Sequence, residues 1–391
     1  MKIIICSESF PPNISGVAVF AKNLAGYLHD AKHEVTVITS NDRFRTEVDR
    51  SLGYQVIKFR SLPNPFRKGF RITVAPYSEV NSFISNIKPD VAHLQDPAPI
   101  SRLVARICQK SKLPVVVTNH FSMDFILSYL KKFQFLNFLI IPLVRRNIVS
   151  LYDRCSIITT PSETAENLIK LWGSKTEIKV MSNGVDIKRF CPGDKTESRK
   201  ILGLPDKPTV LYVGRIDKDK SLAVLIRAVP LVAKRMDVNF AIVGAGDSLE
   251  EMKMLAHEVG ASKNISFLGS FDHGSAKLCS VYQSADLFAS PSKIETQSIV
   301  MLEAMAAGLP IVAARAGSFP EFVADARSGY LFTPDSFSEM AGKIVKLLED
   351  KNLLKDFGHA ARVGMMEHDM DRSLDRFPNL YKRLIDETSR P

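Results

Sequence analysis

The sequence predicts an α/β protein built from two doubly wound domains, each with a parallel sheet covered by helices. Short, nearly continuous Val/Ile runs alternate with amphipathic helical segments, which is typical of parallel strands buried on both faces. The alternation reaches about residue 190, is interrupted by the polar connection 192–200, and begins again. A chain of 391 residues is long enough for two or three domains. We therefore expect domains at 1–190 and 191–370.

In the first domain, apolar runs of four or five residues mark the strands. The helix from Gly16 shows the clearest periodicity, with Phe20, Leu24 and Leu28 on one face. The expected strands are 3–6, 35–39, 56–59, 91–94, 115–118, 157–160 and 178–181, with helices at 16–29 and 100–110.

The second domain repeats this pattern. The expected strands are 209–213, 239–243, 265–268, 287–289, 311–313 and 330–332, with helices at 222–234, 249–259, 299–307 and 337–348. Ligands bind at the carboxyl ends of the strands in such sheets, so we expect a site in the cleft between the two domains.

Composition excludes several classes of protein. An apolar content of 45% and a charged content of 24% exclude a mainly disordered chain. No apolar run reaches the roughly 18–20 residues of a membrane span, and the N-terminal apolar stretch is too short for a signal peptide. The five cysteines are scattered without a C-x-x-C pair, which predicts a reduced cytoplasmic location with no zinc site or disulfides.

Positive charge is concentrated in the first half of the chain. Residues 1–190 hold 26 Lys and Arg against 15 Asp and Glu, whereas residues 191–391 hold 26 against 27. The net charge of +10 therefore comes entirely from the first half. This asymmetry indicates either a generally basic surface or a local patch for phosphate groups, in nucleic acid or on an anionic membrane.

The segment from Pro291 to Pro310 follows a strand, opens a helix and carries two acids, Glu295 and Glu303. Eight helical residues rise about 12 Å, comparable to the distance from a hexose to the ribose of a nucleotide. The N–H groups around Gln297 suit a phosphate or sugar hydroxyls. The segment could therefore hold a nucleotide sugar at three points. The alternative is an acid that complements the helix dipole and an unrelated surface acid.

A second motif follows the strand 209–213. Arg215 and Lys220 emerge where a diphosphate would lie, and such cations would neutralise a departing nucleoside diphosphate. The alternative is a solvated basic loop. Asp217 and Asp219 form a D-x-D pair, but the flanking cations would compete with a metal, so no metal site is predicted.

Three shorter signals lie at other strand ends. Gly16 and Gly244 would allow a phosphate or base to approach the backbone closely, although either could belong to an ordinary turn. His120 ends the strand 115–118 and could face the cleft, where it would hydrogen-bond a sugar hydroxyl, or it could be structural. His93 lies inside a strand and is interpreted either as a core residue or as one that supports a site residue from behind.

The order of these blocks along the chain is typical of glycosyltransferase family 4. Two further segments fit the same order, namely Ser182-Asn183-Gly184-Val185-Asp186 and the Pro11-Pro12…Gly16 opening. The chain resembles that family from residue 3 to about residue 332. The resemblance implies a GT-B fold of two Rossmann-like domains, with the nucleotide-sugar donor bound mainly by the second and the acceptor by the first. It also implies transfer with retention of configuration, no required metal or other cofactor, and a final helix at about 371–391 that returns to the first domain.

The resemblance also implies roles for individual residues. Glu295 would bind the donor sugar, Glu303 the ribose, Arg215 and Lys220 the diphosphate, and His120 the region of the transferred sugar. The expected catalytic residues are Glu295, His120, Arg215 and Lys220. The expected donor-binding residues are Gly16, Arg215, Lys220, Gly244, Gly269, Glu295, Thr296, Gln297, Ser298, Ile299 and Glu303.

One departure from the family pattern concerns the donor. The family often has Phe-Gly after the first acid, whereas this chain has Thr296-Gln297-Ser298. Glu-Thr-Gln resembles the diacylglycerol glucosyltransferase branch, which usually continues with Gly. Ser298 keeps its N–H but adds a side chain close to the donor, which leaves the donor's identity open.

Two regions of the first half combine cations with aromatic residues. Residues 58–71 hold five cations and three Phe without an acid, and residues 121–146 hold six aromatic residues beside four cations. This composition suits the anionic inner face of a membrane, although the Phe side chains could instead be packed core. No nucleic-acid motif accompanies these regions, so nucleic acid is not an expected partner. The predicted patch is Lys58, Arg60, Arg67, Lys68, Arg71, Lys131, Lys132, Arg145 and Arg146.

The sequence thus predicts a peripheral, cytoplasmic hexosyltransferase that acts on a lipid such as diacylglycerol, with UDP-glucose as the favoured donor. The same chemistry on a soluble or polyprenyl-linked glycan remains an alternative, as does mannosyl transfer from GDP-mannose to an inositol lipid. A silent nucleotide-sugar-binding module and a nucleotide-sugar epimerase are the alternatives from other classes.

Overall fold

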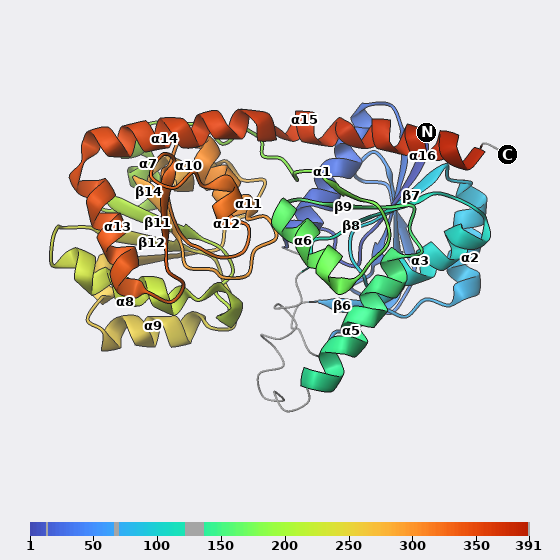
Figure 1. The fold of residues 1–391 in the computed structure, drawn as a ribbon, viewed down its shortest axis with the longest axis horizontal. Helices are drawn as coiled ribbons and strands as arrows, with labels where there is room; N and C mark the ends of the chain where they lie inside the picture. The colour runs from blue at the N-terminus through green and yellow to red at the C-terminus, as the bar shows by residue number, and fades with distance from the viewer. Residues whose placement is uncertain (13–14, 66–69, 122–136, 390–391) are drawn as a thin grey trace. The chain divides into compact units, whose positions relative to one another are not determined.

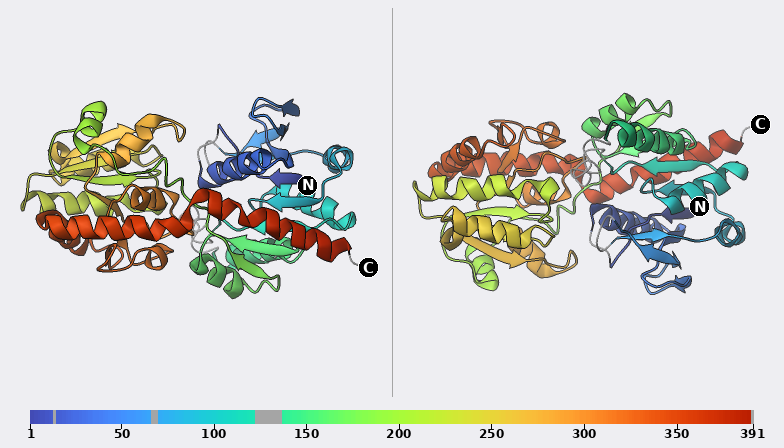
Figure 2. Two further views of the ribbon diagram at one scale, coloured as in Figure 1. Left: turned by 90° about the horizontal axis from the view of Figure 1, so that it is seen from above. Right: turned by 90° about the horizontal axis from the view of Figure 1, so that it is seen from below.

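The computed structural model describes residues 1–12, 15–65, 70–121 and 137–389. The chain divides into two compact units (Figure 1). Unit 1 comprises Met1–Asn183 and Ser373–Pro391, and unit 2 comprises Gly184–Arg372. Each unit has a mainly parallel sheet with helices on both faces (Figure 2). The predicted α/β class is therefore confirmed.

Unit 1 is built on an eight-stranded sheet whose strand order is β10-β9-β8-β7-β1-β2-β4-β3. All its neighbouring strands are parallel except β3 and β4. The strands are β1 (Lys2–Cys6), β2 (Glu34–Ser40), β3 (Glu47–Asp49), β4 (Gln55–Phe59), β7 (Val91–Leu94), β8 (Val115–Thr118), β9 (Ile157–Thr160) and β10 (Ile178–Val180). The sequence predicted all of these except β3. A separate antiparallel pair, β5 (Ser61–Pro63) and β6 (Arg71–Thr73), was not predicted either.

The helices of unit 1 begin where local sequence favours them. Ser15 precedes α1, and its Oγ accepts a hydrogen bond from the backbone N–H of Ala18 at 3.1 Å. Pro99 occupies the first position of α3, where its missing N–H costs nothing. The helices described are α1 (Gly16–Asp30), α2 (Tyr77–Ile87), α3 (Pro99–Lys110), α5 (Asn137–Tyr152), α6 (Glu163–Trp172) and α16 (Arg376–Ser389).

The last helix, α16, belongs to unit 1. Tyr381 from α16 is fully buried, and its hydroxyl lies 2.7 Å from Nδ1 of His93 in β7. The other ring nitrogen of His93 lies 2.6 Å from Oγ1 of Thr118 in β8. The ring of Phe377 packs 5.2 Å from that of His93. His93 is thus a buried structural residue, as predicted, and burial lowers its pKa to about 3.

Unit 2 is built on a six-stranded parallel sheet whose order is β13-β12-β11-β14-β15-β16. All six strands confirm the predicted segments. They are β11 (Thr209–Val213), β12 (Asn239–Val243), β13 (Ile265–Gly269), β14 (Leu287–Ser290), β15 (Ile311–Ala314) and β16 (Gly329–Phe332). The α-helices described are α7 (Lys195–Leu202), α8 (Leu222–Ala233), α9 (Leu249–Glu258), α10 (Ala276–Gln283), α11 (Ile299–Ala306), α12 (Phe319–Phe322), α13 (Phe337–Glu349) and α14 (Lys351–Met365). The short helix α15 (Met370–Leu374) spans the boundary between the two units.

Apolar side chains from alternate strand positions form one core layer on each face of this sheet. Val210 and Tyr212 of β11 pack in the layer that includes residues of α8, α9 and α13. Leu211 of the same strand packs in the opposite layer, with residues of α10, α11 and α14. Burial on both faces explains why these strands read as continuous apolar runs.

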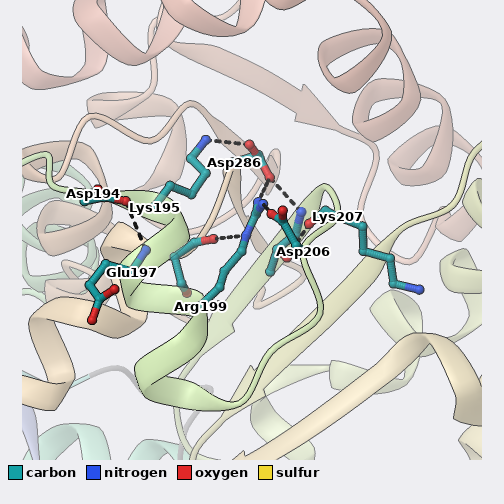
Figure 3. Close-up of polar contacts among 9 residues, drawn as sticks. Asp194, Lys195, Glu197, Arg199, Asp206, Lys207 and Asp286 are labelled. Atoms are coloured by element: carbon teal, nitrogen blue, oxygen red, sulfur yellow. Dashed lines mark hydrogen bonds and ion pairs between the residues drawn. The ribbon is translucent and has the colours of Figure 1, made fainter.

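Asp286 links α7 to the amino ends of β11 and β14 through hydrogen bonds and ion pairs (Figure 3). Its Oδ2 accepts hydrogen bonds from Nη2 of Arg199 and from the backbone N–H of Thr209, both at 2.7 Å, and its Oδ1 lies 2.5 Å from Nζ of Lys195. Arg199 is buried and also contacts the exposed Asp206 at 3.1 Å. The network is therefore structural and lies at the opposite strand ends from the expected ligand site.

Candidate active site

The two acids of the 291–310 segment are held in different ways. Glu295 lies in the connection between β14 and α11 and is positioned by the loop after β15. The backbone N–H of Ser318 donates to the carbonyl of Glu295 at 3.0 Å, and a Cβ on Gly317 would lie 2.9 Å from the Glu295 backbone. Gly317 also has φ +54°, so a side chain there would displace Glu295. Sequence reasoning missed Gly317, because nothing in its own segment indicates which loop it contacts.

Glu295 and Lys220 form an ion pair, with Nζ 2.7 Å from Oε1 and side chains that are 17% and 14% exposed for Lys220 and Glu295. Lys220 follows β11, whereas Glu295 follows β14. These strands are neighbours at the point where the strand order of the sheet reverses, which is the usual ligand position in doubly wound sheets. The structure therefore brings together two predicted site residues that are 75 positions apart in the sequence.

Arg215 also follows β11, and it contacts the D-x-D pair. It forms ion pairs with Asp217 and, at 2.8 Å, with the buried Asp219. Both carboxylates thus have a guanidinium partner. Within the described ranges no group of three or more His, Cys, Asp or Glu side chains could hold a metal ion.

The predicted glycines have distinct environments. The N–H of Gly244 donates to the carbonyl of Gly269 at 2.8 Å, and a Cβ on Gly244 would lie 1.8 Å from the carbonyl oxygen of Gly214. Gly244 is therefore required for the close approach of β11 and β12 where they end. Gly269 ends β13 with φ +71° and open space around it. Gly16 is the exposed first residue of α1 in unit 1.

The connection into α11 is largely buried. Gln297 and Ser298 are 6% and 3% exposed, while Thr296 and Ile299 are partly exposed. Ser298 precedes α11, and its side chain makes no capping hydrogen bond there. The first N–H groups of α11 thus lie next to the Glu295 loop.

Glu303 has two partners that the sequence did not reveal. Its Oε1 lies 2.9 Å from Nε2 of His273, and its Oε2 accepts a hydrogen bond from the hydroxyl of Tyr282. Burial and the neighbouring Glu303 raise the pKa of Tyr282 well above its usual value, so Tyr282 remains a donor. His273 lies in the loop after β13, which Arg189 holds through the carbonyls of His273 and Ser275. No local motif marks His273 or Tyr282.

Unit 1 gathers polar groups at the carboxyl ends of its strands. His120, after β8, lies 3.2 Å from Oε1 of Gln95, after β7, and its ring packs 5.0 Å from that of Phe20. Burial lowers the pKa of His120 to about 3, so its ring is neutral at physiological pH. A neutral imidazole can donate or accept a hydrogen bond at this edge.

Two further acids meet where the strand order of unit 1 reverses, between β1 and β7. Asp96 accepts a hydrogen bond from the backbone N–H of Glu8 at 2.7 Å, and Oε1 of Glu8 accepts two from Thr73 at 2.6 Å. Burial and Asp96 raise the pKa of Glu8 to about 7. Sequence reasoning missed this pair, although an acid directly after each of two strands was a usable signal.

The predicted basic patch is only partly described. Lys58 pairs with Asp49 and Arg60 with Glu79, at 2.8 and 2.7 Å, and Arg71 donates to the carbonyl of Ser61 at 2.8 Å. Arg145 and Arg146 are exposed on α5. The same helix exposes three large apolar side chains, Phe138, Leu139 and Leu143, by 71%, 58% and 69%. Arg67, Lys68, Lys131 and Lys132 lie outside the described residues.

Two doubly wound sheets, with polar site residues where each strand order reverses, define a GT-B glycosyltransferase fold. The chain belongs to glycosyltransferase family 4. Residues 14–189 match the family described as Glycosyltransferase Family 4, and residues 194–363 match Glycosyl transferases group 1. The predicted family and fold are confirmed.

Similar proteins include a sulfoquinovosyl transferase and an enzyme named for a glycolipid product. The chain is 29% identical to sulfoquinovosyl transferase SQD2 of Arabidopsis thaliana, over 94% of this chain and 70% of that protein. It is 27% identical to the alpha-monoglucosyldiacylglycerol synthase of Streptococcus pneumoniae, over 89% and 78%. The Anabaena protein HepE, solved in complex with UDP-glucose, has the same fold, with a TM-score of 0.79, 20% identity and coverage of 98% and 100%. None of the helices in the described ranges combines the length and apolarity needed to span a membrane.

Proposed function

We propose that this glycosyltransferase moves a hexose, with UDP-glucose as the favoured donor, to a membrane lipid such as diacylglycerol, with retention of configuration. The observation that carries the donor side is the Lys220–Glu295 pair where the strand order of unit 2 reverses. A cation suited to a diphosphate thus lies within hydrogen-bonding distance of a carboxylate suited to sugar hydroxyls. In a sugar diphosphate the phosphates and the sugar hydroxyls are adjacent, so the ligand could bind Lys220 and Glu295 together.

The proposed chemistry follows from these charges. The bond between the anomeric carbon and the phosphate oxygen breaks, and the acceptor oxygen bonds to that carbon from the same face. The acceptor's proton passes to the departing phosphate. Arg215 and Lys220 stabilise the charge that develops on the diphosphate, so the reaction requires no metal. Glu303 binds the ribose in place of His273, while His120 hydrogen-bonds near the transferred sugar.

The lipid acceptor is supported by two observations. Relatives that align along most of this chain are named for transfer to diacylglycerol or for sulfoquinovosyl transfer. The first half of α5 exposes three large apolar side chains beside Arg145 and Arg146. Apolar insertion combined with about 1 kcal/mol per cation near an anionic leaflet gives reversible attachment to the cytoplasmic face of a membrane.

The proposal is tested with purified protein, liposomes of diacylglycerol and an anionic lipid, and radiolabelled UDP-glucose or GDP-mannose in parallel. Label should move to the organic phase from UDP-glucose, persist with EDTA and retain the α configuration. Label only from GDP-mannose would support mannosyl transfer instead. Label that enters only soluble sugars would overturn the lipid acceptor. UDP binding without product from either donor would support a silent binding module, for which the buried Ser298 side chain is the motivating observation.

A further inference from the structure

Unit 1 contains a cavity that adjoins the polar edge described above through Thr73, which also bonds Glu8. The cavity has a volume of about 270 Å³ and lies between the first two turns of α3 and the segment that follows β6. Thr73 and Ala75 form one wall, while Ile100, Arg102, Leu103 and Arg106 contribute from α3. Figure 1 shows α3, β6 and α5 within this unit. The cavity combines apolar walls with two guanidinium groups.

The two arginines are spaced to act on one anion. Arg102 and Arg106 are four residues apart, so they lie on the same face of α3 and are separated by about 6 Å along its axis. Within the described ranges neither forms an ion pair with a carboxylate. Arg102 is partly buried, and its Nη2 donates to the carbonyl of Asn147 at 2.7 Å. Burial and then the neighbouring Arg154 lower the pKa of Arg102.

The acids on adjoining elements are already engaged. Glu79 of α2 bonds Arg60 at 2.7 Å and Thr46 at 2.6 Å. Glu8 accepts both hydrogen bonds from Thr73, and its raised pKa reduces its negative charge at neutral pH. Asp96, just before α3, is engaged as well, by Ser101 at 2.9 Å. The acids near the cavity thus have other partners, which leaves the two guanidinium groups able to bind an anion.

Arg102, which lines the cavity, contacts α5, the helix that exposes large apolar side chains in its first half. Leu139, Leu143 and Asn147 follow one another at four-residue spacing, so they lie on one face of that helix. Leu139 and Leu143 are more than half exposed, and the carbonyl of Asn147 holds Arg102. An apolar helix face thus leads toward the guanidinium groups. This arrangement suits an anion that is attached to hydrocarbon chains rather than a freely dissolved one.

We propose that Arg102 and Arg106, which are not among the residues proposed for sugar transfer, form a phosphate site for the headgroup of an acidic phospholipid. The phosphate lies between the two guanidinium groups, which can each donate two hydrogen bonds to phosphate oxygens. The apolar cavity walls and the exposed face of α5 contact the glycerol and upper acyl chains. The site gives the enzyme a contact with the membrane that does not depend on donor or acceptor.

The test measures binding of the full-length protein to phosphatidylcholine vesicles with and without phosphatidylglycerol. The variant is Arg102→Gln/Arg106→Gln. The control, Arg43→Gln/Arg50→Gln, removes the same charge from exposed positions of the same unit. Binding to phosphatidylglycerol vesicles should weaken by about 10- to 30-fold in the variant and by less than about 3-fold in the control. Arg106→Gln alone breaks no hydrogen bond described here and should weaken binding by about 5-fold, which keeps the test valid if the double variant misfolds.

Competition with soluble phosphates shows whether the site prefers a phospholipid headgroup or a free phosphate. Inorganic phosphate and glycerol 3-phosphate should compete for vesicle binding only at concentrations far above that of accessible phosphatidylglycerol. Equal loss of binding in the variant and the control would show that the attraction is non-specific and would overturn the site. Tight binding of inorganic phosphate, lost in Arg106→Gln, would overturn the phospholipid as its source. The vesicle-binding assay contains no nucleotide sugar. A negative result therefore counts against the phospholipid site and not against the proposed transfer activity.

Discussion

Lys220 and Glu295 form an ion pair across the carboxyl ends of β11 and β14, with 2.7 Å between Nζ and Oε1. Each of the two side chains is held in position by the other, because both are mostly shielded from solvent. A diphosphate that binds Lys220 would release Glu295 toward the sugar. Under the proposed function, the pair would couple diphosphate binding at Lys220 to the availability of Glu295 for the sugar. The first two predictions test Glu295 and Lys220 separately.

Glu295→Gln should lower the transfer rate by about 10²- to 10³-fold, the usual effect of removing one stabilising contact in an oxyanion-type site. UDP affinity should not fall, since UDP lacks the sugar that Glu295 is proposed to bind and Lys220 no longer has to leave a carboxylate to bind the diphosphate. The radiolabel assay gives the rate, and calorimetric titration gives UDP affinity. Glu258→Gln, which alters an exposed acid on α9, serves as the control. Retained turnover in Glu295→Gln would remove its assigned role.

Lys220→Met should weaken UDP binding by about 10- to 100-fold, because a charge-assisted hydrogen bond contributes about 1.5–3 kcal/mol. Uridine affinity should not fall, since uridine lacks the diphosphate. Titration of both ligands into the variant and into Lys253→Met, which removes an exposed cation of α9, makes the comparison. Equal weakening of uridine and UDP would show instead that the substitution disrupts the fold of the site.

Asp286→Asn should destabilise unit 2 by about 2–3 kcal/mol. Loss of this carboxylate leaves the buried Arg199 with Asp206 alone as its acidic partner, and breaking a fully buried pair costs about 3–5 kcal/mol. Urea unfolding followed by far-UV circular dichroism measures the change. Fluorescence of the single Trp172 reports on unit 1 and should be unaffected. Lys207→Gln, which breaks a pair with the exposed Asp237, should cost less than about 1 kcal/mol.

Glu8 should make unit 1 less stable as the pH rises. Its folded pKa of about 7 lies above the ordinary value of 4.5, so the folded state holds a proton that the unfolded state has lost. The free energy of unfolding should fall between pH 4.5 and 7, by at most about 3 kcal/mol. Glu8→Gln should remove this fall. Urea unfolding at pH 5 and 8, followed by Trp172 fluorescence, tests it, and equal pH dependence in both proteins would contradict it.

The strands were predictable because each is a run of apolar residues that the sheet buries on both faces. The short strands β3, β5 and β6 were not, since they carry charged or polar residues and pair outside such a core. Strand order cannot be read from periodicity. The contact between Glu8 and Asp96 was therefore not predicted, because the two residues lie 88 positions apart in the sequence.

Charge composition was a weaker guide than strand patterning. The segment 58–71 contains no acid, yet Lys58 and Arg60 each meet one, Asp49 from β3 and Glu79 from α2. Local composition does not reveal partners that another element supplies. The motif residues were easier to place, since Lys220 and Glu295 each follow a recognisable strand. Their direct contact depends on β11 and β14 being neighbours, which only the structure shows.

The position of α16 in unit 1 has a consequence for synthesis on the ribosome. Unit 2 is continuous in sequence and can fold once its last residue emerges, whereas unit 1 requires Phe377 and Tyr381 to cover His93. About 190 residues separate the two parts of unit 1, which at roughly 5–20 residues per second corresponds to about 10–40 s of elongation. During that interval the nascent first unit exposes an apolar face that α16 will later cover. The part of the protein made first is therefore completed last.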